Sequence, residues 1–314
     1  MFKWIPILVC WTHLAFSQDD FFRHPTQGDP YELWSYQFIM DNGTRLWLTY
    51  SNITLPAVGK KNAAELSLYQ FKNSNHAVGR QFPSNEWKED RITGTIEIKD
   101  GYGMYGLPGK GHRVHFATSK SNGFLVDLTF LETQGADSTF RHAQAGTPVQ
   151  MAIHIPQGRV RGKIAVGKDT LSLNGSGSLI HTWHDKPLTE IARQSIRFLA
   201  SGASPLSGQV LIGKNGKPLG HAAKLQDGKW IFLTPKSIQF AKGNIQIDWN
   251  QGEVKPLAWN INKPFQKYSV LSTVDSWMER QAAKVAMGGD RIFLRGMAHM
   301  EFGPMEWVAA GFSE

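Results

Sequence analysis

The clearest pattern along the chain is a period of two in its hydrophobic positions. Between residues 92 and 98, isoleucine or glycine occupies every even position, whereas threonine or glutamate occupies every odd one. Successive side chains of a β-strand point to opposite faces. The segment is therefore predicted to be a half-buried antiparallel strand, with its isoleucines inside and Glu97 and both threonines in solvent.

Similar short runs recur through the first half of the chain, separated by breaks rich in Gly, Asn, Asp and Lys. Asp41-Asn42-Gly43 is a typical hairpin turn between two of them. A run of strands at this spacing, roughly one in ten residues, is typical of a barrel or a sandwich. The glycines of Gly101–Gly111 lack the G-K-S/T of a phosphate loop, so we expect a loop at the mouth of a barrel there. The other predicted strands of this half cover residues 33–40, 46–52, 66–71, 114–118, 124–131, 149–155, 160–166 and 170–173.

A Gly-, Ser- and Pro-containing loop at Ser201–Ser207 is expected to separate two domains, over residues 18–202 and 203–314. The second half again predicts short strands, with hairpin turns at Asn215-Gly216 and Asp227-Gly228. Its exception is Val274–Met287, where apolar residues recur at helical spacing before two glycines. We expect this segment to be a helix that covers the second domain.

The segment Gly175–Leu188, GSGSLIHTWHDKPL, carries the densest functional chemistry. Two imidazoles, an indole and a carboxylate follow two spaced glycines. In an extended strand His181 and Trp183 share one face, whereas His184 points the other way. We therefore expect His181 and Trp183 to point into the interior of the first domain. The spacing alone does not distinguish a packed core from a ligand cavity.

GSGSLIHTW resembles the G-x-G-x-x-D-H-x-W segment of the carotenoid hydratase (hydroxyneurosporene synthase), AttH-like and Diels–Alderase-like calycin superfamily. The segments GTRLWLTYSNI, GFLVDLTF and HTWHDKPLTEIARQSIRFLAS resemble the survival-factor branch, whose members carry ceramide-like lipids. The resemblance implies an all-β fold of two tandem lipocalin-like (calycin) antiparallel barrels with a helix in the C-terminal domain. Ile180 replaces the family's Asp, and Ser204–Gly216 lacks the Tyr-x-Asp pair of the hydratases.

Aromatic residues are abundant, with 11 Trp and 18 Phe. Trp34, Tyr36 and Tyr50 resemble the aromatic N-terminal strands of the family and, with His181 and Trp183, form the predicted ligand-binding set. Plain barrel core is the alternative interpretation of these side chains, because aromatic residues dominate the energetics of cores as well.

The first residues, MFKWIPILVCWTHLAFSQDD, read as a secretory signal peptide over 1–17, with Lys3 before an apolar stretch and Ala15-Phe16-Ser17 as the cleavage site. The single cysteine, Cys10, would leave with it. We expect a secreted or periplasmic protein that has no thiol and no transmembrane segment.

The formal net charge is +8, but the basic residues are scattered, so nucleic acid is not an expected partner. An anionic envelope or lipid surface fits the charge, as does an ordinary solvated surface. His181 and His184 lie three positions apart and face opposite sides of a strand, so no metal site is expected. No cofactor is expected, and no G-x-S-x-G motif indicates a serine hydrolase.

The leading expectation is a non-catalytic protein that binds an apolar, lipid- or isoprenoid-like molecule inside a barrel. The alternative is a hydratase- or cyclase-type enzyme that protonates an isoprenoid or polyketide-like substrate. In that case His181 or Asp185 would be the proton donor, and Trp183 would stabilise a carbocation. A structural or adhesive envelope protein is a third possibility.

Overall fold

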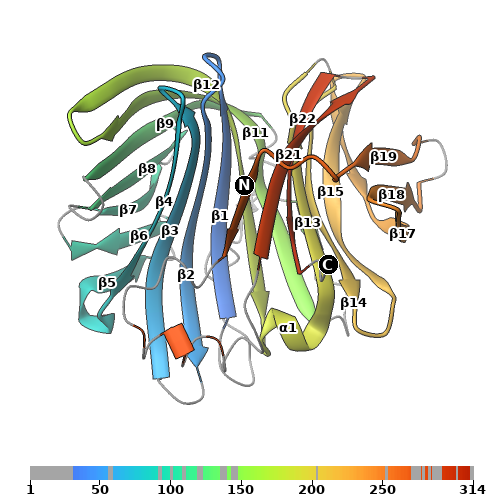
Figure 1. Cartoon of the computed structure of the whole chain (residues 1–314), viewed down its shortest axis with the longest axis horizontal. Coiled ribbons are helices and arrows are strands. Elements are labelled where there is room, and N and C mark those ends of the chain that lie inside the picture. The colour runs from blue at the N-terminus through green and yellow to red at the C-terminus, as the bar shows by residue number, and fades with distance from the viewer. Residues whose placement is uncertain are drawn as a thin grey trace, which may run out of the picture.

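A computed structural model describes residues 31–55, 59–90, 94–99, 102–107, 111–118, 123–134, 140–142, 148–202, 204–251, 254–269, 277, 280–281, 284, 292–301 and 303–311. The predicted signal peptide, with Cys10, lies outside these residues. The described chain is almost entirely β-structure, in a twelve-stranded, a seven-stranded and a three-stranded sheet (Figure 1). The prediction of an all-β fold is confirmed.

The twelve-stranded sheet forms the first domain, and its strands are hydrogen-bonded in the order β4-β3-β2-β1-β12-β11-β9-β8-β7-β6-β5, with β10 paired to β11. Its strands are β1 (Tyr31–Met40), β2 (Arg45–Leu55), β3 (Gly59–Phe71), β4 (Ser74–Phe82), β5 (Trp87–Asp90), β6 (Thr95–Ile98), β7 (Tyr102–Leu107), β8 (Gly111–Thr118), β9 (Phe124–Gln134), β10 (Phe140–His142), β11 (Val149–Val166) and β12 (Asp169–His184).

This sheet curls into a nearly closed barrel whose interior is apolar and aromatic. On the inner face, alternate residues of β1 (Trp34, Tyr36, Phe38) are wholly buried. A side-chain contact crosses the barrel from the edge strand β4, where Arg80 donates to the carbonyl of Ala117 on β8 at 3.3 Å. The alternation of apolar and polar residues in the sequence thus corresponds to side chains that face the interior and the exterior of the barrel in turn.

The seven-stranded sheet has the order β16-β15-β14-β13-β22-β21-β20 and packs one face on the small sheet β17-β18-β19. A short helix, α1 (Leu188–Ile191), leads into it from the first domain. Its strands are β13 (Ala192–Ala200), β14 (Leu206–Gly213), β15 (Pro218–Gln226), β16 (Lys229–Leu233), β20 (Gln266–Ser269), β21 (Ile292–Met300) and β22 (Gly303–Ala310), and the small sheet has β17 (Pro235–Ala241), β18 (Asn244–Trp249) and β19 (Leu257–Asn260).

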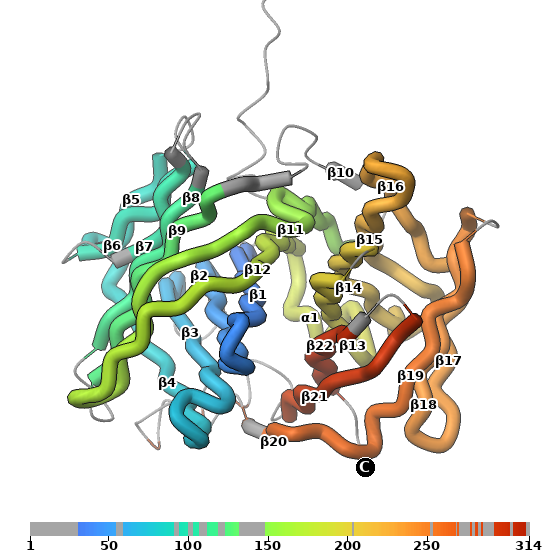
Figure 2. Tube along the Cα trace, turned by 90° about the horizontal axis from the view of Figure 1, so that it is seen from above, coloured from blue at the N-terminus to red at the C-terminus, as the bar shows by residue number. Residues whose placement is uncertain are grey.

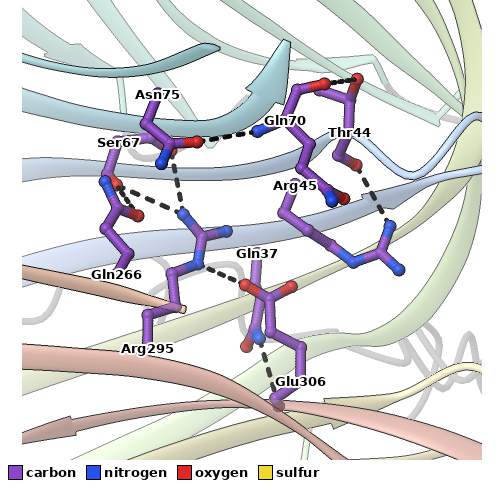
Figure 3. A network of polar contacts seen from close by, with 9 residues as sticks. All are labelled: Gln37, Thr44, Arg45, Ser67, Gln70, Asn75, Gln266, Arg295 and Glu306. Carbon is purple, nitrogen blue, oxygen red and sulfur yellow. Dashed lines mark hydrogen bonds and ion pairs between the residues drawn. The ribbon is translucent and has the colours of Figure 1, made fainter. Parts of the chain in front are cut away.

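The opposite face of the seven-stranded sheet packs against the outer wall of the barrel, so that β1 and β12 lie between the two domains (Figure 2). One half of this interface is apolar: Ile153 and Ile180 from the barrel meet Leu211 and Ala223 from β14 and β15. The other half is polar and buried. There Arg295 pairs with Glu306 and donates to the carbonyl of Ser67 on β3 at 3.2 Å (Figure 3).

The structure places the change of domain earlier than the predicted boundary at residues 202/203. The first sheet ends at His184, and β13 already pairs with β14 and β22 of the second sheet. The Ser201–Ser207 loop joins two strands that pair with each other, Ala200 opposite Leu206, and is therefore a hairpin connection within the second domain. Loops between domains and hairpin connections within a domain are both polar and rich in glycine, so composition alone did not distinguish them.

Two further predictions concern local structure. Ile96 and Ile98 are buried while Glu97 is exposed, which confirms the alternation in the part of that segment that the structure describes. The predicted loop at Gly101–Gly111 is instead mostly strand, because β7 pairs with β6 and β8. Gly103 serves this pairing: a Cβ on it would lie 1.9 Å from the carbonyl oxygen of Ile96.

The predicted helix Val274–Met287 lies largely outside the described residues. Its described members (Trp277, Arg280, Gln281 and Lys284) are helical, and Trp277 is 70% exposed. Among the described residues, no helix is long and apolar enough to cross a membrane.

Candidate functional site

The candidate site lies where β1 begins and β12 ends, on the inner wall of the barrel. In the antiparallel pairing of these strands, Trp34 is opposite His181 and Glu32 is opposite Trp183. All four side chains are buried. Leu179 packs in the barrel core, whereas the next residue, Ile180, packs in the domain interface. The inward orientation predicted for His181 and Trp183 from strand alternation therefore agrees with the structure.

His181 is the centre of a buried hydrogen-bonded chain. Its Nε2 lies 2.8 Å from Oε1 of Glu32, and its Nδ1 lies 3.3 Å from Nε2 of His154. With Glu32 ionised, Nε2–H donates to the carboxylate. Nδ1 of the neutral ring then accepts from His154, and it donates to His154 when His181 is protonated. We call Glu32, His181 and His154 the buried triad.

Two indoles flank the central imidazole of the triad. Trp34 stacks on His181 with ring centroids 4.9 Å apart and planes at 12°, and Trp183 lies 4.7 Å away at 38°. An indole face attracts a cation. The imidazole is thus stacked on aromatic rings and hydrogen-bonded to a carboxylate within an otherwise apolar wall.

A β-bulge brings His154 into this group. The pairing of β11 with β12 shifts between Ile153 and Ile155, so His154 is the extra residue of the bulge. Ile153 packs in the domain interface and Ile155 in the barrel core, which means that the strand changes face at the bulge. Bulges commonly redirect a side chain in this way at barrel rims and functional sites.

A second polar pair lies in the same interior. The Tyr36 hydroxyl and Nε2 of His112 form a short hydrogen bond, and the hydroxyl also donates to Sδ of Met104 at 3.3 Å. Burial lowers the pKa of His112 to about 3, so its ring is neutral. Burial, with a contribution from Tyr50, raises the pKa of Tyr36 well above its ordinary value. The pair is thus an uncharged hydrogen bond.

The structure brings together most, but not all, of the residues predicted from sequence. Trp34, Tyr36 and Tyr50 line the barrel interior, and the Tyr50 hydroxyl is held by the backbone carbonyl of His115 at 2.8 Å. Both tyrosine hydroxyls are therefore engaged by other groups of the protein. Asp185 is exposed beyond the end of β12 and does not join the triad.

Sequence reasoning missed Glu32 and His154. A signal for Glu32 was present, because it precedes Trp34 and Tyr36 at the same alternation and is therefore a carboxylate on an aromatic inward face. His154 lies in an apolar run, but the bulge that turns it inward has no sequence signature. Among the described residues, no group of three or more His, Cys, Asp or Glu side chains is arranged to hold a metal ion.

Comparison with known proteins gives the fold. No protein-family model matches the chain, and no curated protein matches its sequence. A crystal structure of a protein described as an AttH from Nitrosomonas europaea superposes with a TM-score of 0.62 at 13% identity, over 99% of this chain and 100% of that one. The crystal structure of CghA with Sch210972 gives 0.52 at 9% identity, over 90% and 87%.

A kievitone hydratase from Nectria haematococca gives a TM-score of 0.49 at 11% identity, over 94% of this chain and 91% of that one. The two stronger similarities, over 99% and 90% of this chain, show that it has the lipocalin-like calycin fold of AttH-like proteins. At these identities the likeness concerns the fold alone, so a function has to be argued from the site.

Proposed function

We propose that the first barrel binds an apolar small molecule of lipid- or isoprenoid-like chemistry against the wall formed by Trp34, His181 and Trp183. The observation that carries the proposal is the buried triad between two indoles. Apolar sites in proteins are lined by aromatic side chains with a few fixed polar groups that orient the ligand. The triad and its indoles have this composition, and they lie on rigid strands.

A purely structural role would account poorly for this group. A buried carboxylate and two imidazoles must be desolvated on folding, and apolar residues of similar volume usually replace buried ion pairs without loss of stability. Ionisable groups kept in an apolar wall are therefore candidates for function. The resemblance to lipid carriers that the sequence suggests supports the same proposal.

The triad also favours a second candidate function, acid catalysis of the hydratase or cyclase type. His181 as an imidazolium would transfer its proton to one carbon of a substrate alkene, whose π electrons form the new C–H bond. The ring faces of Trp34 and Trp183 would stabilise the cation on the other carbon. Water or an internal nucleophile would then capture that carbon, and the released proton would return to His181 through Glu32 or His154.

The binding proposal is tested by Trp183→Ala, with uptake of a fluorescent fatty acid or retinoid and thermal unfolding measured on the same samples. If Trp183 is only core, its removal costs about 3–5 kcal/mol of stability with unchanged uptake. If it lines a site, affinity falls more than stability does. Trp249→Ala is the matched control, since Trp249 is equally buried but lies in the core of the second domain. Strong destabilisation with unchanged uptake would refute the proposal.

The catalytic candidate makes a separate demand. Glu32→Gln keeps the shape of the side chain but removes the charge that favours protonated His181. It should abolish turnover of an isoprenoid alkene while sparing uptake. Asp185→Asn should leave turnover unchanged, because Asp185 is exposed outside the triad. Equal turnover in wild-type and Glu32→Gln protein would exclude acid catalysis through the triad.

We also propose that the protein is exported, with the mature chain beginning at or near Gln18. The support is the sequence pattern of the first residues, a charged start followed by an apolar stretch and a small-x-small site. N-terminal sequencing of exported protein tests this. Retention of residues 1–17 in a membrane fraction would contradict it.

A further inference from the structure

A pocket of about 580 Å³ opens at the end of the barrel away from the triad. It lies between the turn that joins β3 to β4 and the turn that joins β11 to β12. Phe71 and Val166 contribute apolar surface, His76 lies at its side, and Lys72, Lys168 and Asp169 are exposed around it. Ligand pockets in proteins commonly have volumes of roughly 300–1,000 Å³, so the space is large enough for part of a small molecule.

The rim of this pocket is built from strained backbone. The pairing of β3 with β4 shifts between Leu68 and Phe71, and Gln70, Lys72 and Asn73 all have positive φ, at 57°, 47° and 63°. Residues other than glycine rarely adopt this conformation, because it is energetically unfavourable for them. The protein therefore maintains an unfavourable turn whose result is to place Lys72 at the opening and Phe71 inside.

Neighbouring polar groups hold this turn in place. The backbone N–H of Gln70 donates to Oδ1 of Asn75 at 3.1 Å, and the Thr44 hydroxyl donates to the carbonyl of Gln70 at 3.3 Å (Figure 3). The strained turn is thus anchored to its own hairpin and to the β1–β2 turn. Strain that the surrounding structure enforces in this way is characteristic of binding and active sites.

The pocket has an apolar floor and a cationic opening. Phe71 is almost fully buried, and the His76 ring lies between Phe71 and Phe124 at centroid distances of 6.4 and 5.5 Å. Burial lowers the pKa of His76, so near pH 7 its ring is neutral and extends the apolar surface. At the opening, Lys72 pairs with Asp169, and Lys168 also lines the pocket. The opening therefore carries two cationic side chains and one anionic side chain.

We propose that this pocket binds the carboxylate end of a single-chain amphiphile, separately from the wall at Trp34 and Trp183. The ligand carboxylate would replace Asp169 as the partner of Lys72 and would also contact Lys168. The first methylenes of the chain would lie on Phe71 and Val166. Each methylene that is removed from water raises the affinity by roughly fourfold, so the alkyl chain supplies affinity and the lysines select the head group.

The test is calorimetric titration of the full exported chain with sodium dodecanoate below its micelle concentration. Lys72→Gln should weaken binding by about threefold to tenfold, as expected for one exposed charge-assisted contact. Asp169→Asn should strengthen binding by a similar factor, because it removes the competing carboxylate. Lys255→Gln is the matched control, since Lys255 is exposed and pairs with the exposed Glu301 in the second domain. It should leave the affinity unchanged.

Two probes separate the parts of the ligand. Dodecanol, which lacks the charge, should bind more weakly than dodecanoate and should not respond to Lys72→Gln. Inorganic phosphate alone should not bind saturably, and equal binding of phosphate and dodecanoate would overturn the amphiphile proposal. Thermal unfolding of each variant identifies any that fail to fold. Asp169→Asn then provides the independent measurement, because loss of a merely structural ion pair would not raise affinity.

This outcome is distinguishable from that of the proposed function. Dodecanoate binding that is lost in Trp183→Ala but unchanged in Lys72→Gln and Asp169→Asn would place the ligand at the triad wall and overturn the second site. Binding that responds to Lys72 and Asp169 while retinoid uptake responds only to Trp183 is the result expected for two sites.

Discussion

Three arginines in the described part of the domain interface interact with the carboxylate of Glu306, so Glu306→Gln is a sharp test of how the domains are joined. Glu306 lies on β22, is wholly buried, and accepts from Nε of Arg295 in a short contact (Figure 3). Arg197 is buried too, donates to the carbonyl of Ser35, and lies over the ring of Trp47 at 4.6 Å. Arg45 is the third cation.

The electrostatic effect of Glu306 extends to both of the other arginines. Burial lowers the pKa of Arg197 to about 9, and the charge of Glu306 opposes this. Burial also lowers the pKa of Arg45, which Glu306 again opposes. Glutamine has nearly the same shape, so Glu306→Gln creates no cavity and removes only the charge. All three guanidinium groups would then lack their compensating carboxylate.

Removal of one partner from a buried ion pair typically costs about 3–5 kcal/mol, and we expect a loss in that range. A loss of about 3–5 kcal/mol lowers the ratio of folded to unfolded protein by roughly two to four orders of magnitude. The total stability of a protein is only about 5–15 kcal/mol, so the variant should be folded but markedly weakened. Urea unfolding at pH 7, followed by both tryptophan fluorescence and circular dichroism, measures the change.

Two comparisons make this measurement decisive. Glu301→Gln is the matched control, because Glu301 pairs with Lys255 at 3.0 Å but both side chains are more than 80% exposed. Exposed pairs contribute about 0–1 kcal/mol. The double variant Arg295→Met/Glu306→Leu removes the pair together and should recover much of the loss. A Glu306→Gln protein as stable as the Glu301→Gln control would refute this account of the interface.

Three further predictions concern stability. Gly103→Ala should destabilise by several kcal/mol, since its Cβ would collide with the backbone, whereas Gly216→Ala, with positive φ but open space around it, should cost only about 1 kcal/mol in thermal unfolding. Burial raises the pKa of Glu65 from 4.5 to about 7. The folded protein therefore favours the neutral form of Glu65, whose stabilising contribution is complete below pH 4.5 and is lost as the pH rises through 7. Glu65→Gln should match the stability of wild type at pH 4 and exceed it by up to about 3 kcal/mol at pH 8. Burial lowers the pKa of His112 to about 3, so between pH 6.5 and 3 the ring gains a proton in the unfolded protein but not in the folded one. As the pH falls through this range, the free energy of unfolding of wild type should therefore decrease by about 1.4 kcal/mol per pH unit more than that of His112→Gln. Urea titrations at several pH values measure the difference.

Strand alternation made the inward face of the barrel predictable. The alternation of side chains along β12 is enough to place His181 and Trp183 on the same face, and the alternation along β6 does the same for Ile96 and Ile98. This works because a one-residue slip would turn every apolar side chain of such a strand into solvent. The direction in which a strand residue points is thus local information.

The partners of those residues were not predictable in the same way. Glu32 reaches His181 only because β1 pairs with β12, from the opposite end of the domain sequence. His154 reaches it through a bulge, and a bulge breaks the alternation on which sequence analysis relies. The pocket beside Lys72 likewise depends on left-handed residues other than glycine, which turn signals in a sequence do not reveal. Long-range register and local strain therefore carried the information that the sequence pattern lacked.

The two faces of β1 connect the candidate site to the domain interface. Simple alternation assigns the polar residues Ser35 and Gln37 to solvent, yet both are buried beneath the second domain. Gln37 donates to the carbonyl of Glu306 at 3.4 Å, and Arg197 holds the backbone at Ser35, the residue that follows Trp34. The position of Trp34 against His181 is consequently fixed from inside the barrel by ring stacking and from outside by the second domain. Polar residues on the outer face of a barrel strand here mark an interface, and through it the second domain takes part in the geometry of a site that lies entirely within the first.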